Sequence, residues 1–262
     1  MKEPTSPPRS DAQRIAVVLA VIVQIGSTFL PALGFGEQIG ARSDAVRTAI
    51  TPAGWAFAIW GPLFLGSALF AIWQALPAQR CNRLLSRIAW PAAIALAAQG
   101  VWAIYTQFAN LTFVSVAIIF TSLVGLLIVL RDLTQHYELR RGERWLAALV
   151  LSALAAWLTA ASIVNVSAAL AYSGLGGDFK IAWAAAVMVA IGGIIAAFAT
   201  LKSRGNPWYA LVFCWALFGI YSRGGQENPQ IAIACIAAGV LVALASALGL
   251  TMSENRRHWL GV

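Results

Sequence analysis

The residues best placed to do chemistry in this sequence are aromatic rings, and they cluster in the stretch ITPAGWAFAIWGPLFLGSALFAIWQAL, residues 50–76. The stretch is apolar and long enough to cross a bilayer, a task that Leu and Val would serve equally well. Phe57, Trp60 and Phe64 fall at i, i+3 and i+7, so on a helix their rings share one face. Such a face indicates either the wall of an apolar pocket or helix packing and interfacial anchoring, and both interpretations remain open for this stretch.

Polar and small residues with helical spacing accompany Trp in two other apolar runs. Gln99 and Trp102 lie at i and i+3, whereas Trp157, Ala161 and Asn165 lie at i, i+4 and i+8 on one helical face. Buried amides more often hydrogen-bond neighbouring helices than contact a ligand. Ala161, however, leaves room where a larger side chain would fill a cleft between helices.

Several other chemistries lack the residues they need. The three Lys lie in a tail or at the ends of apolar runs, which excludes a covalently bound retinal, and the two His lie in a loop and a tail, which excludes a bis-His haem site. No Asp, Glu or Arg lies near the centre of a run, so ion-coupled transport is disfavoured. The three Cys are too few and scattered for a zinc site or disulfide framework. We therefore predict no metal, no covalent cofactor and no catalytic residues, that is, not an enzyme.

Composition identifies the class of protein. Of the 262 residues, 60% are hydrophobic and 11% are charged, and the mean hydropathy is +0.76. A soluble domain could not bury so much apolar surface, so the chain is predicted to be a polytopic membrane protein. The net charge of +8 lies almost wholly between apolar runs, where it sets orientation, and we predict no nucleic-acid partner.

Eight runs have the character of membrane-spanning helices. They are residues 15–33, 50–76, 88–108, 111–130, 145–171, 179–201, 207–221 and 229–250. The first is too long for a signal peptide and lacks a clear cleavage site. The seventh has fifteen residues, which at about 1.5 Å each fall short of a core of about 30 Å. The connection GFGEQIGARSDAVRTAI between the first two runs is long, and we predict that it forms a lid.

The basic residues predict the orientation. With eight spans and the amino terminus inside, 14 of the 18 Lys and Arg residues lie on the inner side, and Arg42, Arg47, Lys180 and Arg223 lie outside. Both termini are then cytoplasmic. This topology places Trp60, Trp102 and Trp157 at a common depth in the outer half of the membrane, with Trp157 about 18 Å above Trp145. The shared depth indicates a site between the second, third and fifth helices.

At these residues the sequence resembles the TspO family, the tryptophan-rich sensory proteins related to the mitochondrial translocator protein. The segment TPAGWAFAIWGPLF resembles the family's second-helix motif, Gln99 and Trp102 a motif of the third helix, and Trp157, Ala161 and Asn165 a motif of the fifth. The resemblance covers residues 15–171 and implies a five-helix bundle whose first loop covers a pocket for porphyrins, sterols and synthetic ligands. The pocket residues it implies are Trp55, Trp60, Phe64, Gln99, Trp102, Trp157, Ala161 and Asn165.

These inferences together predict an all-α, polytopic transmembrane bundle of eight helices, the first five of them TspO-like. Residues 1–14 form a flexible tail, 15–171 the five-helix bundle, 172–251 three additional helices and 252–262 a second cytoplasmic tail. The predicted function is binding of an apolar planar ligand, a tetrapyrrole, carotenoid or sterol, by a sensor or translocator in the bacterial inner membrane. The alternative is a structural or assembly subunit whose Trp-rich cleft holds lipid or pigment. The last three helices are the expected contact for a second copy or a membrane-complex partner.

Overall fold

The structure is a computed structural model that describes residues 8–175 and 182–262. Within these ranges the chain forms ten α-helices and several short 3₁₀ or π segments, and no strand. The predicted all-α bundle is therefore confirmed. The predicted start of the sixth run, at residues 179–181, lies outside the described residues.

Five long helices form a closed ring. They are α1 (Asp11–Gly26), α3 (Trp60–Ala75), α4 (Arg83–Ala109), α5 (Phe113–Gln135) and α6 (Leu149–Tyr172). Around the ring α1 packs against α4, α4 against α5, α5 against α6, α6 against α3, and α3 against α1. Short segments extend three of these helices: a 3₁₀ segment Ser27–Leu33 after α1, a 3₁₀ segment Gly54–Ile59 before α3, and a π segment Glu143–Ala148 before α6.

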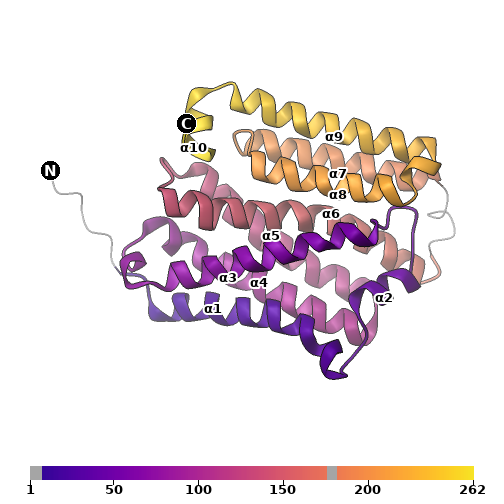
Figure 1. The fold of residues 1–262 in the computed structure, drawn as a ribbon, viewed down its shortest axis with the longest axis horizontal. Coiled ribbons are helices and arrows are strands. Elements are labelled where there is room, and N and C mark those ends of the chain that lie inside the picture. The colour runs from indigo at the N-terminus through magenta and orange to yellow at the C-terminus, as the bar shows by residue number, and fades with distance from the viewer. Residues whose placement is uncertain (1–7, 176–181) are drawn as a thin grey trace.

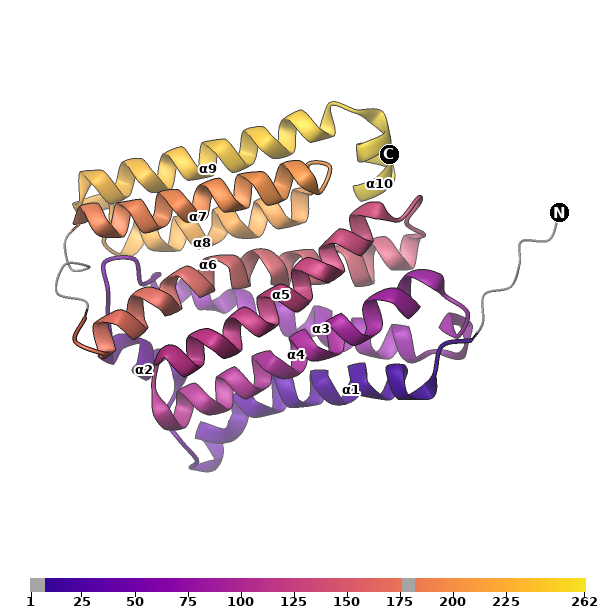
Figure 2. The same ribbon diagram turned by 180° about the vertical axis from the view of Figure 1, so that it is seen from behind.

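Three further helices form a layer on one side of α6. They are α7 (Ala182–Lys202), α8 (Pro207–Arg223) and α9 (Pro229–Leu250), and Figures 1 and 2 show them together above α6, with α1, α3 and α4 on its other side. Small residues bring α7 and α9 together within this chain, because a Cβ added to Gly193 would lie 2.3 Å from that of Ala238. Since both groups of helices cover it, α6 is the most buried of the long helices.

Seven of the described helices are long and apolar enough to cross a membrane. The eighth predicted run, α8, is also a helix, and its 17 residues span about 25 Å at 1.5 Å per residue. Asn206 caps it by accepting hydrogen bonds from the backbone N–H groups of Trp208 (3.1 Å) and Tyr209 (3.2 Å), and Pro207 occupies its first turn. The helix is longer than the predicted 207–221 but still somewhat shorter than the other spans.

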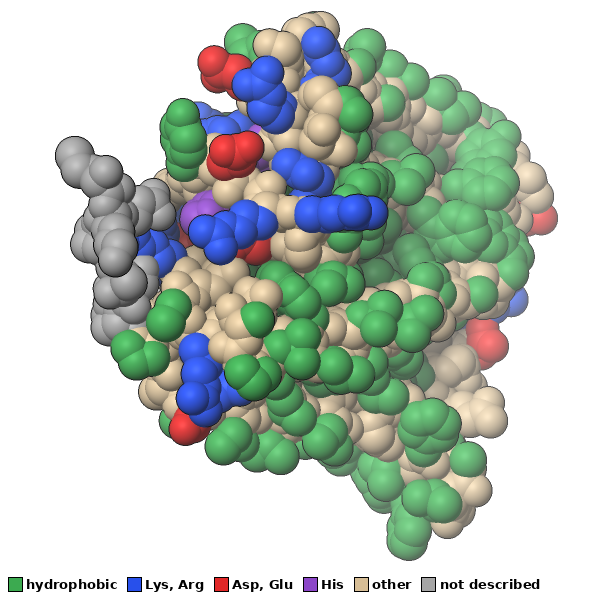
Figure 3. All heavy atoms as spheres, turned by 60° about the vertical axis from the view of Figure 1, so that its left-hand side comes forward, with side chains coloured by type: hydrophobic (Ala, Val, Ile, Leu, Met, Phe, Trp, Pro, Cys, Tyr) green, Lys and Arg blue, Asp and Glu red, His purple; other side chains and the backbone are tan. Residues whose placement is uncertain are grey.

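The two ends of the bundle differ in charge. The first turn of α1 and the last helix, α10 (Ser253–Trp259), lie at the same end (Figure 1), and Figure 3 shows Lys and Arg side chains gathered there beside an apolar flank. We call this the basic end; its residues are Arg9, Arg14, Arg80, Arg83, Arg87, Arg131, Arg140, Arg141, Arg144, Lys202, Arg204, Arg256 and Arg257. The opposite end, which carries α2 (Ile39–Ala45), we call the lid end.

Two segments expected to be tails are partly ordered. Ser10 accepts a hydrogen bond from the backbone N–H of Gln13, so α1 begins at Asp11 instead of residue 15. The buried Arg9 side chain donates to Gln74 Oε1 at 2.9 Å. At the other terminus, α10 lies within the predicted tail 252–262. It docks because Trp259 is fully buried and its indole N–H donates to the Ser203 carbonyl at 2.9 Å.

The docking of α10 is expected to weaken in acid. Burial, followed by the positive charge of Arg204, is the main cause that lowers the pKa of His258 from 6.5 to about 4, and His136 and Arg144 act in the same direction. The docked state therefore holds fewer protons than the undocked state, so docking is fully favourable above pH 6.5 and is weakened progressively as the pH falls from 6.5 to about 4. Hydrogen exchange of the 253–260 peptide, corrected for the intrinsic pH dependence of exchange, should show decreasing protection across this window.

The matched control for this pH effect is His258→Phe, which keeps a ring but cannot be protonated. Its protection should not change with pH between 6.5 and 4. Constant protection of the unmodified chain over the same window would contradict the prediction.

Candidate functional site

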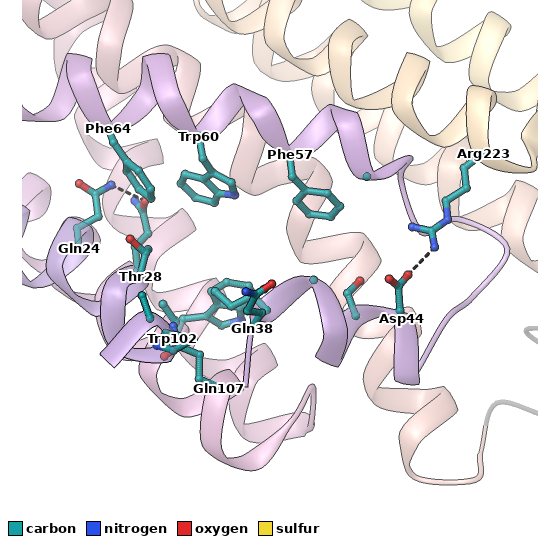
Figure 4. A pocket seen from close by; sticks show the side chains of 18 residues that line it. Gln24, Thr28, Gln38, Asp44, Phe57, Trp60, Phe64, Trp102, Gln107 and Arg223 are labelled. Carbon is teal, nitrogen blue, oxygen red and sulfur yellow. Dashed lines mark hydrogen bonds and ion pairs between the residues drawn. The ribbon is translucent and has the colours of Figure 1, made fainter. Parts of the chain in front are cut away.

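A cavity of about 440 Å³ lies at the lid end, enclosed by α1, α3 and α4 and covered by α2. This volume falls within the usual range for small-molecule sites. Figure 4 shows side chains from α3 on one side of the cavity, facing those of α4 and α2 on the other. The lining residues are Gln24, Thr28, Pro31, Ala32, Gln38, Ile39, Gly40, Ser43, Asp44, Gly54, Phe57, Trp60, Phe64, Gln99, Trp102, Ala103, Gln107 and Arg223.

One wall of the cavity is aromatic. Phe57, Trp60 and Phe64 all point into it from the same side (Figure 4), as their i, i+3, i+7 spacing predicted. The rings of Trp60 and Phe64 are stacked, with centroids 4.9 Å apart. Trp157 of α6 packs edge-on against two of these rings, with its centroid 6.0 Å from that of Phe57 and 6.1 Å from that of Trp60. The wall therefore presents a stack of fixed ring faces to an occupant.

The opposite side carries amides and an indole with unused hydrogen-bonding atoms. Gln24 Nε2 donates to Gln99 Oε1 at 2.7 Å, and Gln107 Nε2 donates to the Ser27 carbonyl at 3.0 Å. The remaining polar atoms, Gln24 Oε1, Gln99 Nε2, Trp102 Nε1 and Gln107 Oε1, are buried without a protein partner. Unpaired buried polar atoms are uncommon and costly, so these four give the cavity two donors and two acceptors for an occupant.

A smaller hollow of about 50 Å³ adjoins the cavity on the side of α6. Trp157, Ala161 and Asn165 line it, and it shares Phe57 and Trp102 with the larger cavity. Asn165 Oδ1 accepts a hydrogen bond from Ser115 at 2.9 Å, whereas its Nδ2 has no partner. The helical spacing of these three residues thus brings them to one face, directly behind the aromatic wall.

The structure brings together seven of the eight predicted site residues. Trp60, Phe64, Gln99 and Trp102 line the larger cavity, and Trp157, Ala161 and Asn165 line the smaller hollow. Trp55 lies elsewhere: its ring packs edge-on against Trp215, with centroids 5.1 Å apart, and at a tilt against Phe218, with centroids 5.3 Å apart, both in α8. It lies two residues before Phe57 and five before Trp60 in the chain, so its side chain points to a different side of this segment from theirs.

The main cavity is displaced from the predicted position. We predicted a pocket between the second, third and fifth helices, which are α3, α4 and α6, but the larger volume lies between α1, α3 and α4. Gln24 of α1 and Thr28 of the 3₁₀ segment that follows it, four residues apart, were the available signal for this displacement. Buried amides more often bond neighbouring helices than contact a ligand, and Gln24 makes such a helix-to-helix contact as well as lining the cavity.

The lid is attached at two places. On one side the backbone N–H of Glu37 and the Arg42 side chain donate to the Gln107 carbonyl at 3.0 and 3.1 Å. On the other side Arg223, at the end of α8, forms an ion pair with Asp44 at 2.5 Å (Figure 4) and donates to the Pro52 carbonyl at 3.0 Å. Asp44 and Arg223 are the charged side chains among the lining residues, and they neutralise each other. The cavity is therefore electrically neutral.

Replacing Arg223 by Gln should make the lid open more often. The substitution removes the ion pair to Asp44 that joins α2 to α8, and an exposed pair of this kind contributes about 0.2–1 kcal/mol. We expect a ligand bound beneath the lid to dissociate up to about fivefold faster, measured by stopped-flow displacement. High salt should reproduce the effect in the unmodified chain and leave Arg223→Gln nearly unchanged. Equal dissociation rates at low salt would show that the pair does not hold the lid.

Comparison with known proteins places these features in a family. A family model described as TSPO-like protein matches residues 12–248. The match begins in α1 and ends in α9, so it covers the five-helix ring and the three-helix layer together, beyond the resemblance seen for residues 15–171. No curated protein and no solved structure gave a match.

Proposed function

This chain belongs to the TSPO-like family of membrane proteins, and we propose that it binds an apolar planar ligand in the cavity beneath α2, as a sensor or translocator. Membership of the family indicates a membrane ligand-binding or sensor protein. The choice of ligand class is our proposal. The observation that carries it is the cavity itself, which combines an aromatic wall, a covering helix and unpaired polar atoms.

The aromatic wall supports a flat ligand. The stacked rings of Trp60 and Phe64 offer extended faces, and ring contacts of this type contribute about 0.5–1.5 kcal/mol each beyond the area they bury. A tetrapyrrole, a sterol or a carotenoid has the extended apolar body that such a wall accommodates. Binding would occur without axial ligation, because neither His nor Cys is among the lining residues.

The unpaired amide and indole atoms favour some of these ligand classes over others. A ligand with hydrogen-bonding substituents at its edge would satisfy Gln99 Nε2, Trp102 Nε1 and Gln107 Oε1, whereas a pure hydrocarbon would leave them unpaired. This favours tetrapyrroles and hydroxylated sterols over hydrocarbon carotenoids.

We propose binding and not catalysis at this site. Its two charged side chains are paired with each other at the lid, and the other polar groups are amides, hydroxyls and an indole. A hydroxyl acts as a nucleophile only when a base activates it, and Asp44, the carboxylate among the lining residues, is paired with Arg223. Within the described residues, no group of three or more His, Cys, Asp or Glu side chains is arranged to hold a metal ion.

We propose that the basic end faces the cytoplasm, which places the cavity in the outer half of a bacterial inner membrane. The support is the concentration of Lys and Arg at that end (Figure 3), with Arg42, Arg47 and Arg223 at the other among the described residues. A ligand would then enter from the outer leaflet or the space beyond it.

The position of the α7–α9 layer helps to decide between a binding protein and the alternative, a structural or assembly subunit. A layer that served only to dock a partner need not contact the site. Here α8 packs on α6 and on the segment that holds Phe57, and it supplies Arg223 to the lid. We therefore assign the layer to the support of the binding site, and we treat contact with a second copy or another membrane protein as an additional role.

The proposal is tested by titrating protoporphyrin into the purified chain in detergent. Trp60, Trp102 and Trp157 lie at the cavity, so binding should quench intrinsic Trp fluorescence saturably. When a sterol or a hydrocarbon carotenoid is added as a competitor, the sterol should displace the porphyrin at a lower concentration than the carotenoid does. N-acetyltryptophanamide in the same micelles controls for light absorption by the porphyrin. Quenching that is linear and equal in the protein and this control would contradict the proposal.

A further inference from the structure

A second crevice, of about 340 Å³, lies near the basic end, where the five-helix ring meets the α7–α9 layer. One side is formed by α5 and the other by α7, with α6 and α8 at the back. Its lining residues are Leu123, Leu127, Leu130, Arg131, Thr134, Gln135, Thr159, Ile195, Phe198, Ala199, Lys202, Ser203 and Tyr209. It shares no residue with the cavity under the lid.

The crevice is closed toward the interior and open toward the membrane. At the back, the buried hydroxyls of Thr159 and Tyr209 are hydrogen-bonded to each other at 2.8 Å, which joins α6 to α8. At the front, Leu127, Ile195 and Phe198 are exposed on the membrane-facing surface. An occupant therefore enters sideways from the bilayer.

The two cations of the crevice lie where it is nearest to the basic end of the bundle, and we call this part its mouth. Arg131 is in the last turns of α5, and Lys202 is the last residue of α7, with its Nζ 5.4 Å from the centroid of the Phe198 ring. Neither side chain forms an ion pair within the part of the chain that the structure describes, and no Asp or Glu lines the crevice. The mouth is therefore a site of uncompensated positive charge.

The apolar part of the crevice runs from this mouth into the membrane. Leu123 lies eight residues before Arg131, about 12 Å along α5, and Ile195 lies seven residues before Lys202, about 10 Å along α7. The cations thus lie at the depth of lipid headgroups, and the apolar walls at the depth of acyl chains. This order of charge and apolar surface matches one molecule of an anionic phospholipid.

We propose that the crevice between α5 and α7 binds an anionic phospholipid. Arg131 and Lys202 hold its phosphate, and an acyl chain lies along Leu127, Ile195 and Phe198. Charge-assisted hydrogen bonds to the phosphate supply the preference for an anionic headgroup. The bound lipid occupies the space between the five-helix ring and the α7–α9 layer. This site is independent of the ligand that the lid covers.

The test uses the full chain purified in mild detergent and native mass spectrometry with added phosphatidylglycerol or phosphatidylcholine. We expect retention of phosphatidylglycerol to exceed that of phosphatidylcholine by about thirtyfold, given two cations near the headgroup. The double variant Arg131→Gln/Lys202→Gln should lose this difference. The matched control, Arg140→Gln/Arg141→Gln, removes the same charge from exposed positions at the same end but outside the crevice, and should keep it.

Two further measurements separate a lipid site from a site for free phosphate. Ile195→Trp fills the crevice without changing charge and should lower lipid retention severalfold, whereas inorganic phosphate at millimolar concentration should not displace the lipid. Equal retention by the unmodified chain and the crevice double variant would overturn the proposal, as would an equal loss in the control pair. Full retention by Ile195→Trp, or displacement by phosphate, would also overturn it. Gel filtration and circular dichroism verify that each variant is folded.

Discussion

Replacement of Ala103 by Phe is expected to weaken saturable porphyrin binding strongly. Ala103 lines the cavity under the lid from α4, next to Trp102, and its methyl group is nearly buried. A benzyl group at this position would project into empty volume, so it would occupy the ligand's place without overpacking a closed core. We expect binding at least about tenfold weaker, which corresponds to 1.4 kcal/mol or more, measured by quenching of Trp fluorescence.

Val101→Phe is the matched control for this variant. Val101 lies two residues earlier in α4, is about half exposed (48%) on the outer surface and lines none of the hollows described above. It adds a similar ring that faces lipid instead of the cavity, so porphyrin affinity should not change. Equal binding by the unmodified chain and Ala103→Phe would show that the ligand lies elsewhere. Ala161→Phe would then test the hollow beside α6.

The helices and much of the aromatic wall were predictable from local pattern. Eight apolar runs became eight long helices, because a run of about twenty apolar residues can satisfy its backbone in a bilayer only as a helix. Phe57, Trp60 and Phe64 share a face because their spacing sets the direction of each ring relative to the helix axis. These features depend only on residues close together in the sequence.

The features that sequence did not predict depend on contacts between distant segments. Arg223 reaches the lid because α8 lies against the segment before α3, and its charge pair with Asp44 joins residues 179 positions apart. Gln24 became a lining residue because α1 packs against α4, and Trp55 left the site because α8 lies beside it. Nothing in the spacing of these residues specifies such pairings.

The helix α10 was not predicted for the same reason, because it too depends on contacts between distant segments. The segment SENRRHW is polar in composition and indicated a tail, but it docks between the residue that follows α7, to which Trp259 donates, and the π segment that precedes α6. Arg144 fixes the helix by donating to the carbonyls of His258 and Arg257, both at 3.0 Å. Burial of one ring together with capped carbonyls explains why a seven-residue helix is stable at this end.

Replacement of Trp259 by Ala is therefore expected to release α10 from the bundle. The ring is fully buried, and its removal leaves a cavity and the Ser203 carbonyl without its indole donor. Truncation of a buried Trp in a core costs about 3–5 kcal/mol. Because α10 is a short helix held to the bundle by this ring and by Arg144, the chain can detach this helix instead of unfolding, so the loss is limited to the free energy of docking. Trypsin should then cleave after Arg256 and Arg257 much faster than in the unmodified chain.

The control for this substitution is Trp183→Ala, which truncates a Trp that is 59% exposed on the membrane-facing side of α7. It should leave cleavage at Arg256 and Arg257 unchanged, because it does not contact α10. Porphyrin binding should survive in Trp259→Ala, since the cavity lies at the opposite end of the bundle. Loss of both docking and ligand binding would mean that α10 stabilises the whole bundle, whereas unchanged cleavage would show that Arg144 alone is sufficient to hold α10.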